Sequence, residues 1–116
     1  MAVDIQKYFN EDLPAAMAKN PDAARAIGAK YQMNVSGSGG GEWFIDVSAG
    51  GPKCFAGFPG GADATIIIAT EDFQKLYEDP KSNTMPLFFA ARLKVSGDPR
   101  LGLQISKIFD LTSPGY

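Results

Sequence analysis

The sequence predicts an α+β domain in which helices cover an antiparallel β-sheet. Two patterns predict this class. Between about residues 30 and 68, apolar and polar side chains alternate in short runs that Gly-rich turns separate, while the segments on either side show helical spacing and helix-capping residues. The chain has 116 residues, of which 45% are hydrophobic and 21% are charged. We therefore expect one domain that spans residues 1–116.

Four strands are predicted in the middle of the chain from an apolar period of two. Turn-forming runs at 36–41, 49–52 and 59–61 separate them. Because consecutive strands are joined by turns at near-regular spacing, we expect an antiparallel meander at the start of the sheet. A fifth strand is predicted over residues 92–96. The residues expected to face inward from the first four strands are Tyr31, Met33 and Val35; Trp43, Ile45 and Val47; Cys54, Ala56 and Phe58; and Ala64, Ile66 and Ile68.

Helices are predicted before and after these strands. In the first 28 residues, Pro14 and the pair Asn20-Pro21 mark two helix starts. Thr70 is expected to cap a third helix, which ends at Asp79-Pro80. A polar linker is then expected before the apolar run at 87–91, and Asp98-Pro99 is expected to open the last helix.

The composition excludes several classes of function. Eleven Lys and Arg against 13 Asp and Glu give a net charge of −2, so no nucleic-acid partner is expected. The sequence has no histidine, which is the commonest general base and metal ligand, so we expect no catalytic residue, no metal and no cofactor. The single cysteine, Cys54, favours a reducing, cytoplasmic location. The Gly-rich run at 37–41 precedes a strand, which favours a hairpin over a phosphate-binding loop.

The apolar side chains that follow the fourth strand leave two interpretations open. In the first, they pack against the sheet and fill the core. In the second, the helices stand off the sheet and enclose a ligand cavity. Leu103 lies off the main stripe of the last helix, and Gly102 costs a helix about 1 kcal/mol relative to Ala and often marks a close approach or an opening. Both features favour the second interpretation.

From about residue 60 onward the sequence resembles the sterol carrier protein type-2 domain. The family pattern is an A-D-x-T-I strand, a helix, an F-F-x-G-K-L-K segment and a final apolar helix. The matching residues are Ala62-Asp63, Thr65-Ile66, Phe88-Phe89, Arg92-Leu93-Lys94-Val95, Gly97-Asp98 and Leu101. The resemblance implies a five-stranded, mostly antiparallel sheet covered on one face by helices. It also implies a hydrophobic tunnel between the two layers and a non-enzymatic role in lipid binding or transfer.

The resemblance further implies a ligand and a set of tunnel residues. The ligand is a sterol, fatty acid, fatty acyl-CoA or phospholipid, and transient membrane contact is a further expectation. Two alternatives stay open: a structural or accessory protein-interaction module with a filled core, and an enzyme that acts on a lipid through Asp or Tyr chemistry. The tunnel residues are Trp43, Ile45, Ile66 and Ile68 as floor; Phe73, Leu76 and Tyr77 as one wall; Leu87, Phe88 and Phe89 as wall and lid; and Leu101, Leu103, Ile105, Ile108 and Phe109 from the last helix.

Overall fold

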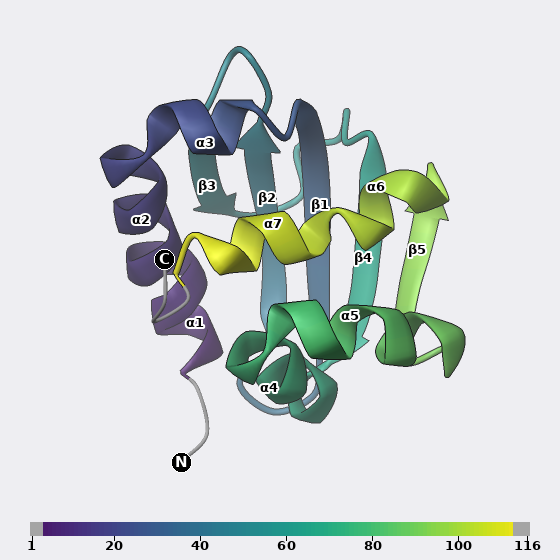
Figure 1. The fold of residues 1–116 in the computed structure, drawn as a ribbon. Helices are drawn as coiled ribbons and strands as arrows, with labels where there is room; N and C mark the ends of the chain where they lie inside the picture. Colours follow the sequence, from purple (N-terminus) through teal and green to yellow (C-terminus); the bar gives the residue numbers. More distant parts are fainter. Residues whose placement is uncertain (1–3, 113–116) are drawn as a thin grey trace.

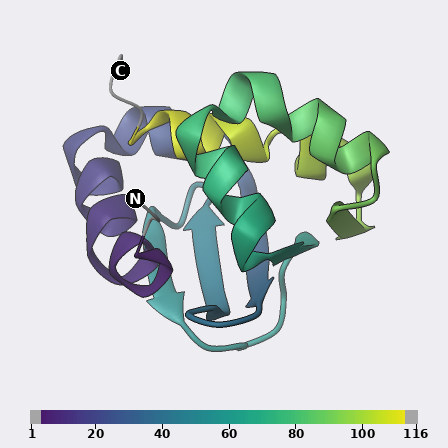
Figure 2. The same cartoon turned by 90° about the horizontal axis from the view of Figure 1, so that it is seen from below.

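Helices cover one face of a five-stranded sheet and leave the other face without helices (Figure 1). The computed structural model describes residues 4–112, apart from the side chains at positions 80, 81 and 103. Seen along the sheet, the helices form one layer and the strands form the other (Figure 2). The predicted fold class is confirmed.

The strands are β1 (Ala29–Ser36), β2 (Gly41–Val47), β3 (Lys53–Ala56), β4 (Ala64–Ala69) and β5 (Leu93–Gly97), in the spatial order β3-β2-β1-β4-β5. Neighbouring strands pair antiparallel except β1 and β4, which are parallel. The sheet is therefore mostly antiparallel, as predicted. The expected four-strand meander is wrong at β4, which pairs with β1 and not with β3.

The loop between β3 and β4 explains this pairing. It crosses the face of the sheet that lacks helices and runs below the strands in Figure 2. Near its start, the Gly57 amide donates to the carbonyl of Glu42 on β2, and the Gly57 carbonyl accepts from the side-chain amide of Gln32 on β1. At its end, the Asp63 amide donates to the carbonyl of Lys30, also on β1. The crossing carries the chain over β2 and β1, so β4 can add in parallel to the free edge of β1.

The predicted alternation sets which side chains face the helices. The inward residues of β1, β2 and β4 are buried, with the largest exposed fraction being 5%, at Val35. On β3, Cys54 packs against the core while Ala56 is exposed. The expectation for Phe58 is wrong, because β3 ends at Ala56 and Phe58 is 61% exposed in the crossing loop.

The helical layer is built from short segments, which are α1 (Ile5–Lys7), the π-helical turn η1 (Tyr8–Asp12), α2 (Leu13–Lys19), α3 (Pro21–Arg25), α4 (Thr70–Glu78), α5 (Pro80–Phe89), α6 (Pro99–Leu103) and α7 (Ile105–Asp110). The predicted starts near residues 21, 70 and 99 are confirmed, but Ala69 and not Thr70 occupies the cap position of α4. The predicted start at Pro14 is wrong, because the chain is already helical from Ile5 and η1 leads directly into α2. Asp98 caps α6 as expected, since its carboxylate accepts from the Arg100 amide at 2.9 Å.

Two further expectations for the helices are wrong. The segment from residue 80 is the helix α5 and not a polar linker, because the carboxylate of Asp79 accepts from the Ser82 amide at 3.2 Å and caps a new helix directly after α4. The last helix is interrupted at Gln104, which divides it into α6 and α7. Gly102 on α6 is buried against Val95 of β5. The glycine therefore marks a close approach between a helix and a strand.

Candidate functional site

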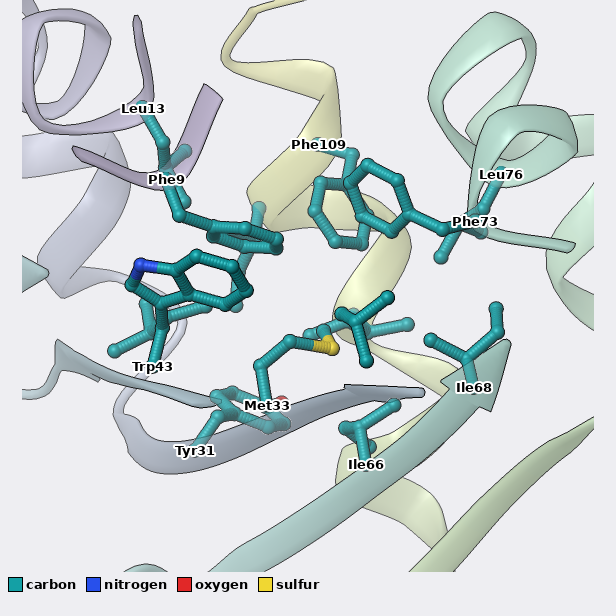
Figure 3. Close-up of a cluster of buried hydrophobic side chains, with 14 of the residues drawn as sticks. Phe9, Leu13, Tyr31, Met33, Trp43, Ile66, Ile68, Phe73, Leu76 and Phe109 are labelled. Carbon is teal, nitrogen blue, oxygen red and sulfur yellow. The ribbon is translucent and has the colours of Figure 1, made fainter. Parts of the chain in front are cut away.

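The space between the helices and the sheet holds the candidate site. Figure 3 shows its side chains converging from the sheet below and from the helices above. We call the buried side chains between the helices and the sheet the inter-layer cluster. It includes ten residues that the sequence predicted for a ligand site, each at most 5% exposed: Trp43, Ile45, Ile66, Ile68, Phe73, Leu76, Leu87, Ile105, Ile108 and Phe109.

Aromatic rings dominate one half of the inter-layer cluster. The ring of Phe9 stacks on the indole of Trp43, with centroids 4.7 Å apart. Phe9 also meets Phe73 at 5.3 Å, and Phe73 meets Phe109 edge-on at 5.5 Å (Figure 3). Tyr8 contacts Phe73 and Phe109 at 5.7 and 5.8 Å. Edge-on and offset contacts of this kind stabilise aromatic groups beyond their burial alone.

Sequence reasoning missed the contribution of the N-terminal helix. Tyr8 and Phe9 are both fully buried, although adjacent positions on a regular α-helix point about 100° apart. Both belong to the π-helical turn η1, whose wider backbone departs from the 3.6-residue period. The apolar spacing before residue 10 therefore matches a regular helical stripe poorly, and composition was the only signal that could have found these residues.

The polar atoms within the inter-layer cluster are paired and uncharged. The Trp43 Nε1–H donates to Asn10 Oδ1 at 3.0 Å, and the hydroxyls of Tyr8 and Thr112 are 2.9 Å apart. The Tyr31 hydroxyl donates to the carbonyl of Leu101 at 2.7 Å. Burial raises the pKa of Tyr31 to about 12 and raises the pKa of Tyr8 further above its ordinary value. The cluster thus offers an apolar, neutral surface to any occupant.

The remaining predicted site residues lie at the border of the cluster or outside it. Phe88 and Leu101 are half-buried, and Tyr77 is 37% exposed. Phe89 is 74% exposed, so its ring does not belong to the buried cluster. The side chain of Leu103 falls outside the described part of the structure.

Several surface grooves lie along the helical layer. One lies between the start of α1, the β1–β2 turn and the start of α4, and it carries the acidic side chains Asp4 and Glu71. Another lies between α3 and α7 and combines apolar side chains with Lys107 and Asp110. A third lies between α2 and the residues that follow α7. Between the two layers, aromatic side chains of the inter-layer cluster contact one another directly.

One buried ion pair joins two parts of the helical layer. Arg92 Nη1 lies 3.0 Å from Asp72 Oδ1. The side chain of Asp72, near the start of α4, is only 5% exposed, whereas that of Arg92, between α5 and β5, is 54% exposed. Because a buried carboxylate needs a nearby cation, the pair helps to fix α4 to the end of α5.

Residues 4–112, which the structure describes, contain neither a candidate metal site nor a candidate membrane span. Among them, no group of three or more His, Cys, Asp or Glu side chains is placed to hold a metal ion. None of the helices described has the length and apolar character needed to cross a membrane.

Solved structures with this architecture include sterol carrier proteins. Sterol carrier protein 2 from Yarrowia lipolytica, in its apo form, matches with a TM-score of 0.67 at 23% sequence identity, covering 93% of this chain and 85% of that one. Sterol carrier protein 2 from Aedes aegypti, in complex with the C16 fatty acid palmitate, matches with a TM-score of 0.66 at 14% identity, covering 96% of this chain and 98% of that one. At these identities the likeness concerns the fold.

Sequence comparison establishes the family. The model of the SCP-2 sterol transfer family matches residues 9–110, so the chain belongs to this family, as the resemblance predicted. Among curated relatives, hydroxysteroid dehydrogenase-like protein 2 of Rattus norvegicus is 36% identical over 88 residues, and that of Homo sapiens is 31% identical over 90. The chain spans only about a fifth of the length of these relatives, 17% and 21% respectively.

Proposed function

We propose that this protein binds a lipid with a long hydrocarbon part between its helices and its sheet, and that it holds or transfers that lipid without catalysis. The observation that carries the proposal is the inter-layer cluster: a predominantly apolar, uncharged layer in a chain of the SCP-2 sterol transfer family. Residues 1–116 act here as one lipid-binding domain. The ligand residues are the ten buried members of the cluster together with Tyr8 and Phe9.

We expect lipid entry to separate the two layers, because aromatic side chains from both layers contact one another directly between them. Each methylene group moved from water into the cluster contributes about 0.8 kcal/mol, so a sixteen-carbon chain offers enough to offset the cost of parting a few side-chain contacts. The helical layer is the part expected to move. It consists of short segments joined at single residues, such as Asp79 between α4 and α5 and Gln104 between α6 and α7.

The proposed ligand class is a sterol, fatty acid, fatty acyl-CoA or phospholipid. Two comparisons support it: the palmitate bound to the Aedes aegypti protein of the same fold, and the hydroxysteroid named in the curated relatives. Transient contact with a membrane belongs to the same proposal, since long-chain lipids reside there. The free thiol of Cys54 supports a reducing, cytoplasmic compartment.

The first experiment uses Trp43, the only tryptophan of the chain, as a built-in reporter. Its indole is 3% exposed and stacks on Phe9, so a lipid that parts the layers must change its emission. Purified, delipidated protein is titrated with palmitate, palmitoyl-CoA and cholesterol. As a matched control, Ile67→Trp is placed in a Trp43→Phe background, where the reporter lies on the opposite face of the same sheet at a site 41% exposed.

We expect the emission of Trp43 to change and to saturate at micromolar lipid concentrations. The emission of the Ile67→Trp control should not change. Mass spectrometry of an organic extract of freshly purified protein then identifies any lipid that co-purifies. A folded protein that shows neither a saturable change nor a co-purified lipid would contradict lipid binding.

A protein-interaction module is the second candidate, and one observation favours it. The sheet face opposite the helices carries Phe55, 43% exposed, and Ile67, 41% exposed, while Phe58 is 61% exposed on the loop that crosses this face. Exposed apolar groups of this kind are common at protein interfaces. Failure of every lipid titration, together with capture of a protein partner that Phe55→Ser abolishes, would favour this candidate.

Catalysis is tested in the same samples. We propose none, because burial raises the pKa of Tyr8 and of Tyr31 and keeps both hydroxyls neutral. Incubation with an acyl-CoA is expected to give stable binding without release of free CoA. Steady turnover that is lost on changing one carboxylate would contradict a purely binding role.

A further inference from the structure

The helix α5 is attached to the inter-layer cluster by few buried side chains. Among its described side chains, those of residues 82–89, Thr84 and Leu87 are buried at 3% and 5% exposure, and Phe88 is half-buried at the border. The neighbouring helix α7 has six residues against ten in α5, yet it buries three apolar side chains at 1% exposure or less. Since burial of apolar side chains holds a short helix to its domain, α5 is held less firmly than α7.

The backbone of α5 is also weakened from within. Pro86 lies inside the helix and has no N–H, so the bond that a regular helix makes to the carbonyl of Ser82 is missing. The helix lies beside α7 in the helical layer (Figure 1). Because Leu87 of α5 belongs to the inter-layer cluster, a displacement of α5 uncovers the cluster next to α7.

A residue with a non-helical backbone lies at each end of α5. Asp79 joins α4 to α5 with φ −151° and ψ 84°. Ala91 follows α5 with φ 59°, and the next amide, that of Arg92, donates back to the carbonyl of Leu87 at 2.9 Å, as in the Schellman motif. Hinges of mobile segments are commonly such positions at the ends of elements, since rotation there moves a helix without unfolding it.

The chain beyond each of these two residues is held in place. Arg92 pairs with the buried carboxylate of Asp72 on α4 at 3.0 Å. Leu93 then begins β5 and pairs with Ile68 of β4. On the other side, α4 buries two apolar side chains completely. The segments on both sides of α5 are therefore fixed to the sheet and to the cluster more firmly than α5 itself.

We propose that α5 is a lid through which a hydrocarbon chain reaches the inter-layer cluster, and that it swings about Asp79 and Ala91 while α4, α7 and the sheet keep their places. The inference rests on the proposed function, and it names the part of the helical layer that opens. Opening withdraws Leu87 from the cluster. The hydrogen bond from the side-chain amide of Asn83 to the carbonyl of Lys75 lies beside the first hinge, where the displacement is smallest.

The first test measures how readily buried positions become accessible in the folded protein. Leu87→Cys is made in a Cys54→Ala background, and its reaction with iodoacetamide at pH 8 is followed at urea concentrations below the unfolding transition. Leu13→Cys, which removes the same side chain from a fully buried site on α2, and Val35→Cys, which lies on β1 with the same 5% exposure as Leu87, are the matched controls. Local opening exposes little surface and depends little on urea, whereas global unfolding depends on it strongly.

We expect iodoacetamide to react with Leu87→Cys at least about 10-fold faster than with either control, after correction for the measured free energy of unfolding of each variant. The rate for Leu87→Cys should be nearly independent of urea, and the rates for both controls should follow global unfolding. The lid is refuted if all three thiols follow global unfolding, or if Leu13→Cys opens as readily as Leu87→Cys.

The second test follows the entry of monomeric palmitate by stopped-flow emission of Trp43. Leu87→Ala removes the buried apolar side chain of α5, so the open lid is populated more often and the entry rate should rise about 10-fold. Leu13→Ala removes the same side chain from α2 and should leave the entry rate near that of the wild type. An unchanged rate for Leu87→Ala, or an equal increase for both variants, would overturn the proposal.

The lid and lipid binding can fail independently, because thiol labelling needs no lipid and the equilibrium titration of Trp43 with palmitate needs no lid variant. If palmitate binds but Leu87→Cys reacts only through global unfolding, the lid is refuted and lipid binding stands. If Leu87→Cys reacts through local opening but no lipid binds, lipid binding is refuted together with the role of α5 in lipid entry.

Discussion

Adding one methyl group at Gly102 should separate α6 from β5. An ideal Cβ at this position would lie 2.9 Å from Cγ1 and 3.0 Å from Cβ of Val95, and it would overlap Cγ2 of the same side chain. Carbon atoms in van der Waals contact are about 3.5–4.0 Å apart. Rotation of Val95 about χ1 cannot relieve the contact with its own Cβ, and valine is stiff at this angle. The helix must therefore move away from the strand.

Two opposing effects set the magnitude of Gly102→Ala. Overpacking of a filled interior costs about 1–3 kcal/mol, whereas replacing Gly by Ala inside a helix stabilises it by about 1 kcal/mol. We expect the clash with Val95 to outweigh the gain in helix propensity, so that the free energy of unfolding falls by about 1–2 kcal/mol. For a chain of this size that corresponds to a decrease in Tm of roughly 4–8 °C.

The assay is urea and thermal unfolding followed by Trp43 fluorescence and circular dichroism. Gly50→Ala is the matched control, because no atom lies within 4 Å of the added Cβ there. In the double variant Gly102→Ala/Val95→Ala the clash is absent, so the loss should be smaller than the sum of the two single losses. A Gly102→Ala protein as stable as wild type, or strictly additive effects in the double variant, would refute the close-packing argument.

Three further predictions concern backbone strain and buried titratable groups. Ala91 follows the end of α5 at φ 59°, a conformation that costs Ala about 1–2 kcal/mol. Ala91→Gly relieves this strain but increases the entropy of the unfolded chain, so we expect the free energy of unfolding to rise by about 0.5 kcal/mol in urea titrations. A loss of stability in this variant would contradict the strain. Burial raises the pKa of Tyr31 from 10 to about 12, so the stability that the neutral hydroxyl contributes is complete below about pH 10 and is lost as the pH rises to 12. Between pH 8 and pH 12 the free energy of unfolding should therefore fall by about 1–2 kcal/mol less in Tyr31→Phe than in the wild type. The same fall in both proteins would contradict this prediction. Burial raises the pKa of the Cys54 thiol to about 12, and its Sγ–H donates to the carbonyl of Phe9. Iodoacetamide at pH 8 should therefore react at least about 100-fold more slowly with the folded protein than with the urea-unfolded protein. Similar rates would show that the thiolate is accessible in the folded protein.

The parts of the fold that follow from local patterns were predictable from the sequence. The period of two in β1, β2 and β4 correctly identified their inward faces, because a half-buried strand imposes that period on its side chains. Asp98-Pro99 correctly marked the start of α6, since a capping carboxylate and a first-turn proline act within three residues. The number of strands followed from the same alternation, which predicted four strands in the middle of the chain and a fifth over residues 92–96.

The parts that depend on distant contacts were not predictable. The parallel pairing of β4 with β1 depends on a loop that crosses the sheet, and no local signal distinguishes a crossing loop from a hairpin. The helix α5 was missed because Pro86 lies inside it and its apolar residues do not form one stripe. The buried inter-layer cluster was predicted where burial follows periodicity, as at Ile66 and Ile68. It was missed at Tyr8 and Phe9, where a π-helical turn changes the period.

The two layers differ in how they are held, and this difference bears on how a closed protein can carry a lipid. The sheet is fixed by backbone pairing along all five strands, so its inward side chains form a stable floor. The helices above it are short and are held mainly by side chains in the inter-layer cluster and by the Asp72–Arg92 pair. A hydrocarbon chain that enters replaces apolar contacts between the layers with apolar contacts of its own, so most of the burial is retained while the helices move. Direct side-chain contacts between the layers are therefore compatible with lipid binding in this fold, because these contacts are of the same kind as those that the ligand would make.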